Sequence, residues 1–133
     1  MKYFLHFLKL ESYSQLHRDK IRIGEIMMQT INTEAEFQEI IQSEKPVIIK
    51  FFADWCPDCK RMDMFIGEVM EEFENYDWYE VNSDEVSGLA EKYEVMGIPS
   101  ILLFQNGEKI AHQHSAYTKT PDSVTEFLNQ QLG

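Results

Sequence analysis

The feature that most constrains this chain is a pair of cysteines, Cys56 and Cys59, at the junction of an apolar run and a helical pattern. Residues 46–53 are rich in β-branched and aromatic side chains and predict a strand covered on both faces. The helical pattern begins near Pro57, so the unpaired N–H groups of its first turn and the positive end of its dipole favour a thiolate at Cys56. Cys59 lies one turn further on the same face, close enough for a disulfide. This geometry suits a reversible dithiol–disulfide couple.

Two other interpretations of the pair stay open at this point. A structural zinc site usually takes four ligands, but the histidines of the chain show no H-x-x-x-H spacing near the cysteines. A purely structural disulfide across so small a loop would restrict the unfolded chain very little. We therefore favour a redox role for the pair and expect no metal site.

Length and charge limit the number of domains and the kinds of partner that this chain can have. A chain of 133 residues is long enough for one domain with a hydrophobic core. The net charge of −11 argues against nucleic acid and anionic membranes as partners. No apolar run approaches the length of a membrane span. Functional rather than structural cysteines suit a reducing compartment, so we expect a cytoplasmic protein.

Residues 1–26 differ from the remainder of the chain. They carry a net charge of +2, which leaves −13 for the rest. Their apolar stretch, residues 3–8, is short for a signal peptide, and no A-x-A-like cleavage site follows it. We interpret residues 1–26 as an extension, either an amphipathic helix or a disordered segment, or as sequence upstream of a true start at Met27 or Met28. The domain itself is expected to span residues 27–133.

From residue 27 the hydrophobic pattern predicts the element order β-α-β-α-β-α-β-β-α, an α/β domain with a mixed sheet. The strongest helical pattern starts near Pro57 and continues to Phe73. Thr33 and Glu36 fit a capping box, and Asn106-Gly107 is typical of a type I′ hairpin turn. Strands are expected at residues 28–31, 46–53, 76–81, 100–104 and 109–114, with further helices after Thr33, around residues 86–93 and after Thr120-Pro121.

Three segments of the chain resemble the thioredoxin family. They are FFADWCPDCK at residues 51–60, KYEVMGIPS at residues 92–100 and FQNGE at residues 104–108. Several motifs in the family's order and spacing make the resemblance specific. It covers residues 27–133, and within the family the chain most resembles small bacterial thioredoxin-like proteins with a WCPDC site. The resemblance implies a thioredoxin fold, with a central mixed sheet of about five strands flanked by four helices.

The resemblance also implies a chemistry, thiol–disulfide exchange that reduces protein disulfides. Cys56 would be the exposed nucleophile that attacks the substrate disulfide, and Cys59 would resolve the mixed disulfide. Pro99 is expected to follow a cis peptide bond and to lie against the cysteines. The implied cofactor is none beyond the Cys56–Cys59 disulfide, and the implied partners are protein disulfides and a thioredoxin reductase.

A substrate-docking surface around the pair follows from the same resemblance. The backbone at Ile98 would pair with an extended stretch of substrate. Trp55 can be interpreted as core filler, but its place beside Cys56 favours the rim of the site. The residues expected on this surface are Trp55, Pro57, Ile98, His114, Ser115 and Ala116.

Four positions depart from the usual family pattern. Pro57-Asp58 replaces Gly-Pro between the cysteines, and Met64 replaces a helix-kinking proline. Ser115 replaces a glycine that opens the substrate groove, which suggests a different substrate surface. The Asp58 carboxylate opposes the helix dipole and should disfavour the Cys56 thiolate. We expect a reducing couple, with a potential of roughly −230 to −270 mV.

The fourth departure concerns Lys50, which stands where the family keeps a buried aspartate behind the resolving cysteine. Glu80 falls on the position of a neighbouring lysine, so the two charges look exchanged. A buried lysine needs a partner, which predicts a contact between Lys50 and Glu80. Glu80 would then accept the proton of Cys59. In the alternative, Lys50 extends to the surface and the two side chains never meet.

A second functional class remains open from the sequence alone. The chain could be a redox-sensing adaptor or a chaperone-like binding module whose dithiol acts as a latch. The intact C-x-x-C and the Gly97-Ile98-Pro99 segment favour the reductase.

Overall fold

A five-stranded mixed sheet with the strand order β1-β3-β2-β4-β5 runs through residues 28–133, the part of the chain that the computed structural model describes. Strands β1, β3 and β2 are parallel, and β4 and β5 are antiparallel to their neighbours. The interpretations of residues 1–26 lie outside the described residues. The strands are β1 (Gln29–Ile31), β2 (Val47–Phe52), β3 (Asp77–Asn82), β4 (Ser100–Gln105) and β5 (Glu108–Gln113).

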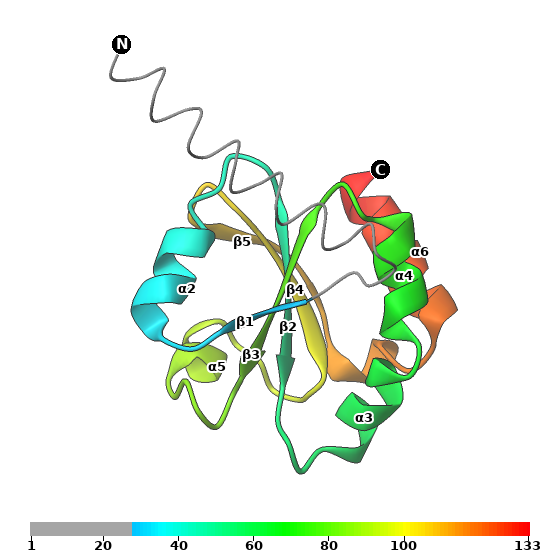
Figure 1. Ribbon diagram of the computed structural model, residues 1–133, viewed down its shortest axis with the longest axis horizontal. Coiled ribbons are helices and arrows are strands. Elements are labelled where there is room, and N and C mark those ends of the chain that lie inside the picture. The colour runs from blue at the N-terminus through cyan, green and yellow to red at the C-terminus, as the bar shows by residue number, and fades with distance from the viewer. Residues whose placement is uncertain (1–27) are drawn as a thin grey trace.

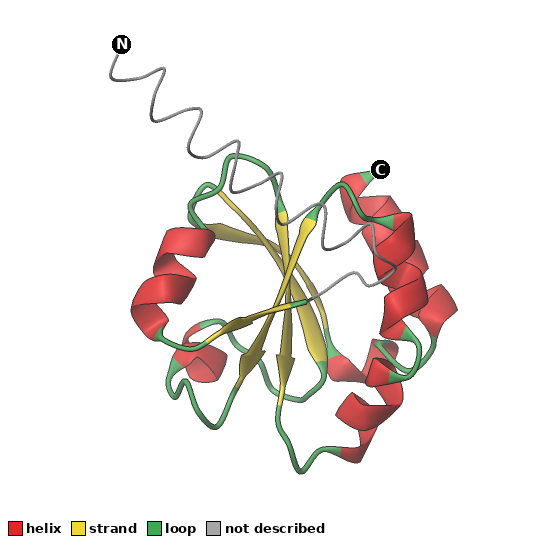
Figure 2. Cartoon of the chain, in the orientation of Figure 1, coloured by secondary structure: helices red, strands yellow, loops and turns green. Residues whose placement is uncertain are grey.

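Helices cover both faces of this sheet (Figures 1 and 2). One face carries α2 and α5, and the other carries α3, α4 and α6. The helices are α2 (Glu34–Ile40), α3 (Pro57–Asp63), α4 (Ile66–Glu72), α5 (Leu89–Lys92) and α6 (Pro121–Leu132), with a 3-10 turn, η1, at Ser115–Tyr117. The predicted mixed sheet is therefore confirmed, and so is the order of elements, except that two helices stand between β2 and β3 where one was expected.

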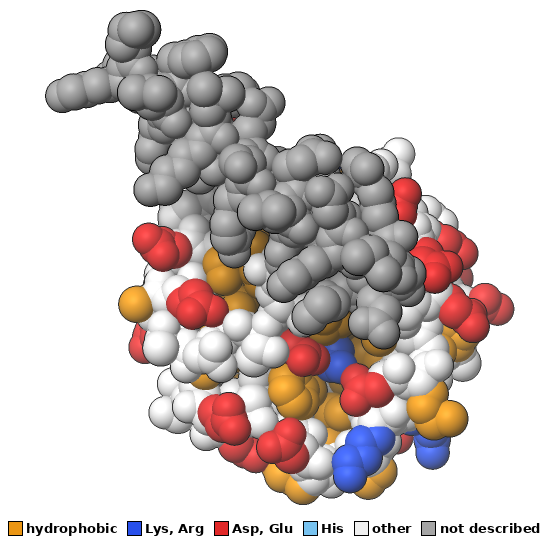
Figure 3. Space-filling model, in the orientation of Figure 1, with side chains coloured by type: hydrophobic (Ala, Val, Ile, Leu, Met, Phe, Trp, Pro, Cys, Tyr) orange, Lys and Arg blue, Asp and Glu red, His pale blue; other side chains and the backbone are white. Residues whose placement is uncertain are grey.

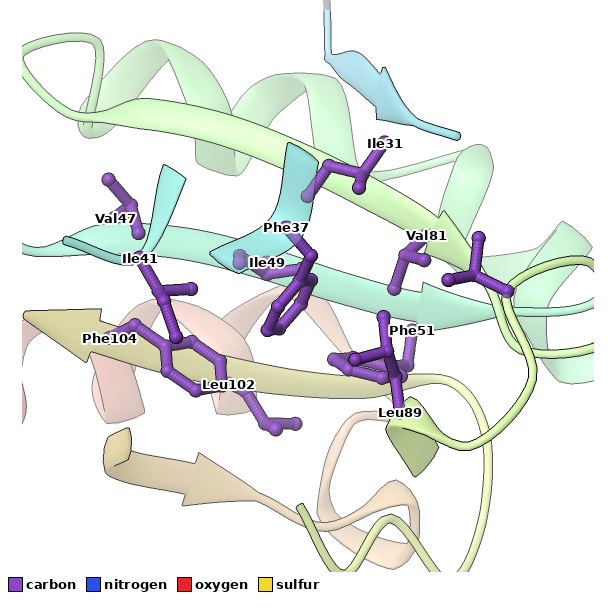
Figure 4. Packing of buried hydrophobic residues seen from close by; sticks show 11 residues of the cluster. Ile31, Phe37, Ile41, Val47, Ile49, Phe51, Val81, Leu89, Leu102 and Phe104 are labelled. Carbon is purple, nitrogen blue, oxygen red and sulfur yellow. The ribbon is translucent and has the colours of Figure 1, made fainter. Parts of the chain in front are cut away.

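The central position of β2 explains its composition. Alternate side chains of this strand enter two separate cores, so both of its faces must be apolar. On the α2 and α5 side, Phe37 and Phe104 meet edge to face with ring centroids 5.3 Å apart (Figure 4). On the other side, Ile48 packs with Met62 and Val69. Both cores hold β2 rigidly, and the cysteine pair follows directly from its end.

The helical pattern from Pro57 to Phe73 forms two helices and not the single one that the predicted element order contains. The helix stops at Asp63 and a second one starts at Ile66, so five α-helices rather than four flank the sheet in the described residues. At the break the N–H groups of Met64 and Phe65 donate to carbonyls three residues back, which tightens the turn. Met64 is 86% exposed there. The apolar spacing continues in register across the break, and for that reason the pattern does not reveal it.

Local signals for the helix starts and the hairpin are confirmed. The Thr33 hydroxyl accepts the N–H of Glu36 at 3.1 Å, and Thr120 caps α6 in the same way. Asn106 and Gly107 have φ values of 52° and 85°, as a type I′ turn requires. The predicted helix around residues 86–93 is shorter than expected and spans only the four residues Leu89–Lys92. It begins after Gly88, whose φ of 92° lies in the left-handed region and is incompatible with a right-handed helix.

The surface reflects the acidic composition. Acidic side chains are spread over the face shown in Figure 3, whereas basic ones are few. Within residues 28–133, no helix has both the length and the apolar character needed to cross a bilayer.

Candidate active site

Cys56 and Cys59 form a disulfide at the start of α3, with their Cα atoms 5.2 Å apart. Cys56 is the N-cap residue, in extended conformation, and Pro57 occupies the first turn, where its missing N–H costs no helical hydrogen bond. The Cys59 N–H donates to Cys56 Sγ at 3.1 Å. A backbone donor aimed at this sulfur at a helix N-terminus favours negative charge on it, as the sequence predicts.

Burial of the pair differs from the prediction. Cys56 is 3% exposed and Cys59 is 2% exposed, so the expectation of an exposed nucleophile is wrong. The two cysteines pack with Ala53, Phe52 and Ile98 in a small apolar cluster of their own. Exposure therefore does not distinguish the two sulfurs, and the N–H contact to Cys56 does.

The peptide bond between Ile98 and Pro99 is cis, as predicted. The Ile98 carbonyl oxygen lies 3.6 Å from Cys56 Sγ. The segment that contains the cis bond therefore lies beside Cys56, although 42 residues separate Ile98 from Cys56 in sequence.

Trp55 lies at the surface beside the pair and is 68% exposed. Its indole N–H donates to the Asp84 carboxylate at 2.8 Å. The interpretation of Trp55 as core filler is therefore wrong, and Asp84 is a neighbour of the site that sequence reasoning missed. Asp84 follows β3, so only the parallel pairing of β2 and β3 could have revealed that both residues lie at the same sheet edge.

The segment from His114 to Thr120, here called the rim loop, lies against the cis peptide. A Cβ atom placed on Gly97 would be 2.3 Å from Ser115 Oγ, so the serine side chain fills the space beside this glycine. The Thr118 hydroxyl is buried and lies 3.0 Å from the Pro99 carbonyl oxygen. His114 and Ala116 are exposed. The structure thus brings Ser115 close to Gly97-Ile98-Pro99.

Asp58, between the cysteines, contacts two basic side chains. Its carboxylate accepts a hydrogen bond from the Lys119 ammonium at 2.5 Å, and Arg61 lies 3.6 Å away. The hydrogen bond and charge of Lys119 hold the pKa of Asp58 below its usual range, with a smaller contribution from Arg61. Sequence reasoning treated this carboxylate as uncompensated, because Lys119 is 61 residues away.

Lys50 is buried behind α3, with 2% of its side chain exposed. It stands opposite Glu80 in the β2–β3 register, and its Nζ lies 3.5 Å from the Glu80 carboxylate, so the predicted contact is confirmed. A second carboxylate, that of Asp63, lies closer, at 2.5 Å. Sequence reasoning missed Asp63 because it searched the neighbouring strand and not the end of the helix that crosses over Lys50. Among residues 28–133 no group of three or more His, Cys, Asp or Glu side chains could hold a metal ion.

His112 and His114 stack at the edge of the rim loop, with ring centroids 3.9 Å apart. The Lys109 ammonium lies 3.0 Å from His112 Nδ1, which must be unprotonated to accept it. Burial, together with the charges of Lys109 and His114, lowers the pKa of His112 to about 4.

This shift predicts a loss of stability in mild acid. An unfolded histidine takes up its proton near pH 6.5 and folded His112 only near pH 4, so the free energy of unfolding should fall as the pH drops through that interval. Because His112 is partly exposed, we expect a loss of about 1–2 kcal/mol. Urea unfolding at pH 7 and pH 4.5 measures it. His112→Gln should flatten the dependence and His114→Gln should keep most of it; equal slopes in wild type and His112→Gln would contradict the assignment.

Comparisons with known proteins agree with this geometry. The family model described as Thioredoxin matches residues 28–130. Thioredoxin-1 of Saccharomyces cerevisiae is 35% identical over 85 residues, which are 64% of this chain and 82% of that relative. Thioredoxin M-type of Spinacia oleracea is 32% identical over 105 residues, 77% of this chain, and the match spans 58% of that relative. The solved structure of Plasmodium falciparum thioredoxin superposes with a TM-score of 0.69 at 26% identity, covering 77% of this chain and 98% of that one.

Proposed function

This chain belongs to the thioredoxin family and is a thiol–disulfide oxidoreductase, and we propose from this premise how its own residues reduce protein disulfides. The observation that carries the proposal is the Cys56–Cys59 disulfide at the start of α3, beside the cis Ile98–Pro99 bond.

In the proposed reaction the reduced protein starts with Cys56 as a thiolate. Its Sγ attacks one sulfur of the substrate disulfide, a new S–S bond forms, and the second substrate sulfur leaves as a thiolate. Cys59 then loses its proton and attacks Cys56 Sγ, which releases the first substrate sulfur. The substrate gains two electrons, and the chain ends with its own disulfide. The Cys59 N–H, 3.1 Å from Cys56 Sγ, supports negative charge at the attacking atom.

The docking surface is proposed to include the predicted residues around the pair. Exposed Trp55 would contact the substrate with its ring while Asp84 fixes its orientation. The backbone at Ile98 would pair with an extended stretch of substrate. Pro57, His114, Ser115 and Ala116 would complete the surface, and the Ser115 side chain beside Gly97 would select against bulky groups there.

We also propose the electron donor and the cellular location of this reaction. A thioredoxin reductase would return electrons to the disulfide, no cofactor besides the pair would take part, and the reaction would take place in the cytoplasm. Residues 1–26 would lie outside the catalytic domain, residues 27–133. The couple would be reducing, near the thioredoxin end of the known range, as the family relationship suggests. The Asp58 charge would contribute less to this than the sequence alone predicts, because Lys119 compensates it. Equilibration with glutathione measures the potential.

Insulin reduction tests the reaction. The wild-type protein with dithiothreitol should precipitate the insulin B chain well ahead of dithiothreitol alone, because the dithiol supplies an activated thiolate. Cys56→Ser should fall to the dithiothreitol rate, a loss of about three orders of magnitude in the catalysed component. If the wild-type protein does not accelerate the reaction, the alternative of a redox-sensing adaptor would be supported. The family relationship does not favour that alternative.

Glu80 is proposed as the proton acceptor for Cys59, as its contact with Lys50 suggests. Glu80→Gln should slow resolution of the mixed disulfide at least about tenfold while the attack by Cys56 stays near normal. Stopped-flow fluorescence between about pH 6 and pH 8 separates the two steps. Asp63→Asn is the matched variant, because it removes the other carboxylate on Lys50. An unchanged rate in Glu80→Gln, or a slower one only in Asp63→Asn, would contradict the assignment.

A further inference from the structure

The ion pair between Lys119 and Asp58 joins the rim loop to the dipeptide between the cysteines. Both partners are partly exposed, Lys119 at 47% and Asp58 at 36% of the side chain. The hydrogen bond of 2.5 Å crosses from the loop that precedes α6 to the first turn of α3. It is therefore a tertiary contact at the site and not a pair within one helix.

Charge at this position matters for the reaction. An ionised carboxylate in the first turn of α3, two residues after Cys56, counteracts the stabilisation of the Cys56 thiolate by the helix dipole and by the Cys59 N–H. The Lys119 ammonium, in hydrogen-bond contact, cancels most of that opposition. Arg61 is the weaker counterion, because it lies 3.6 Å from the carboxylate and is 65% exposed.

Thr118, the residue before Lys119, makes a second tie. Its buried hydroxyl can donate to the Pro99 carbonyl or to the Ser115 carbonyl, each 3.0 Å away. Two consecutive residues of the rim loop thus contact the two elements that flank the disulfide, the cis peptide and α3. Loss of the contact between Lys119 and Asp58 would leave the rim loop attached to this region only through Thr118.

We propose that Lys119 is a positioning residue for the redox pair: it neutralises Asp58, keeps the Cys56 thiolate available at neutral pH and fixes the rim loop against α3. The inference rests on the proposed function, since it concerns the step in which Cys56 attacks. It also explains how a WCPDC site can tolerate an acid between its cysteines.

The test is the rate at which iodoacetamide alkylates Cys56 in the full, reduced chain, measured against pH at low salt. Lys119→Met should lower the rate at pH 7 about threefold, whereas Asp58→Asn should raise it much less, because Lys119 already compensates the carboxylate. In the Asp58→Asn background, Lys119→Met should have less than half of its effect on log rate, because the carboxylate it compensates is gone. Lys119→Arg should restore the wild-type rate. In 0.5 M salt the difference between wild type and Lys119→Met should shrink, since the pair is partly exposed.

Lys92→Met, on α5, is the control for the loss of one positive charge and should leave the rate unchanged. Equal effects of Lys119→Met with and without Asp58 would overturn the inference, as would no effect in the wild-type background. Alkylation requires no turnover of substrate. If the chain fails to reduce insulin but its variants show these alkylation rates, the proposed reductase activity is refuted and the role of Lys119 stands. If the chain reduces insulin but Lys119→Met alkylates at the wild-type rate, the role of Lys119 is refuted and the reductase activity stands.

Discussion

Cys59→Ser should turn the transient mixed disulfide into a stable adduct. In the wild type, resolution is intramolecular between two residues whose Cα atoms are 5.2 Å apart, and such reactions have very high effective molarities. Without the second thiol the adduct can break only through an external thiol, so its lifetime should rise by about three orders of magnitude or more. Non-reducing electrophoresis of the reduced variant mixed with insulin measures the adduct over time.

The matched variant Cys56→Ser decides which sulfur attacks. Both cysteines are equally buried, so exposure predicts no difference between the two variants. The hydrogen bond from the Cys59 N–H to Cys56 Sγ predicts a large difference in adduct yield between the two variants. Adducts should form only in the variant that keeps Cys56. Adducts of similar yield from Cys56→Ser would assign the attack to Cys59 and reverse the proposed order of steps.

The sequence was sufficient wherever local pattern determines structure. Strand β2 could be predicted because both of its faces enter apolar cores, and the hairpin because Asn106 and Gly107 tolerate positive φ. The cysteine pair and the cis bond before Pro99 were located by motif.

What the sequence could not provide depends on contacts between distant elements. The break after Asp63 leaves the apolar spacing intact and is therefore invisible to periodicity. Lys119 reaches Asp58 across 61 residues, and no pattern links a loop lysine to a helix carboxylate. The burial of Cys56 involves Ile98, which packs against the cysteine pair although 42 residues separate it from Cys56.

Lys50 is the one charged side chain among the buried residues of the described part of the chain. Its side chain is 2% exposed, in a strand whose other residues are apolar, and its ammonium lies over the Phe52 ring at 5.3 Å from the centroid. Asp63 and Glu80 are its two counterions, at 2.5 and 3.5 Å. Removal of a buried charge's partners leaves the charge uncompensated, which is far more costly than removal of the whole cluster.

The double variant Asp63→Asn/Glu80→Gln should therefore lose about 3–5 kcal/mol of unfolding free energy. Each single variant should lose only about 1 kcal/mol, because one carboxylate remains and Asp63 is itself 59% exposed. The two effects are then strongly non-additive, which a double-mutant cycle by urea unfolding detects. Glu68→Gln/Glu71→Gln, two exposed residues of α4, makes the same change in net charge and should leave stability within about 0.5 kcal/mol of wild type.

Lys50→Met should behave in the opposite way. It removes the buried charge together with its need for partners, so the free energy of unfolding should stay near the wild-type value or rise by about 1 kcal/mol. In the Lys50→Met background, the loss of both carboxylates should cost almost nothing. If Asp63→Asn/Glu80→Gln were as stable as its control, the Lys50 ammonium would be reaching water, and the case for a proton acceptor on Glu80 would lose its electrostatic basis. A large loss that Lys50→Met abolishes would instead show that the exchanged charges act as one cluster behind the cysteines.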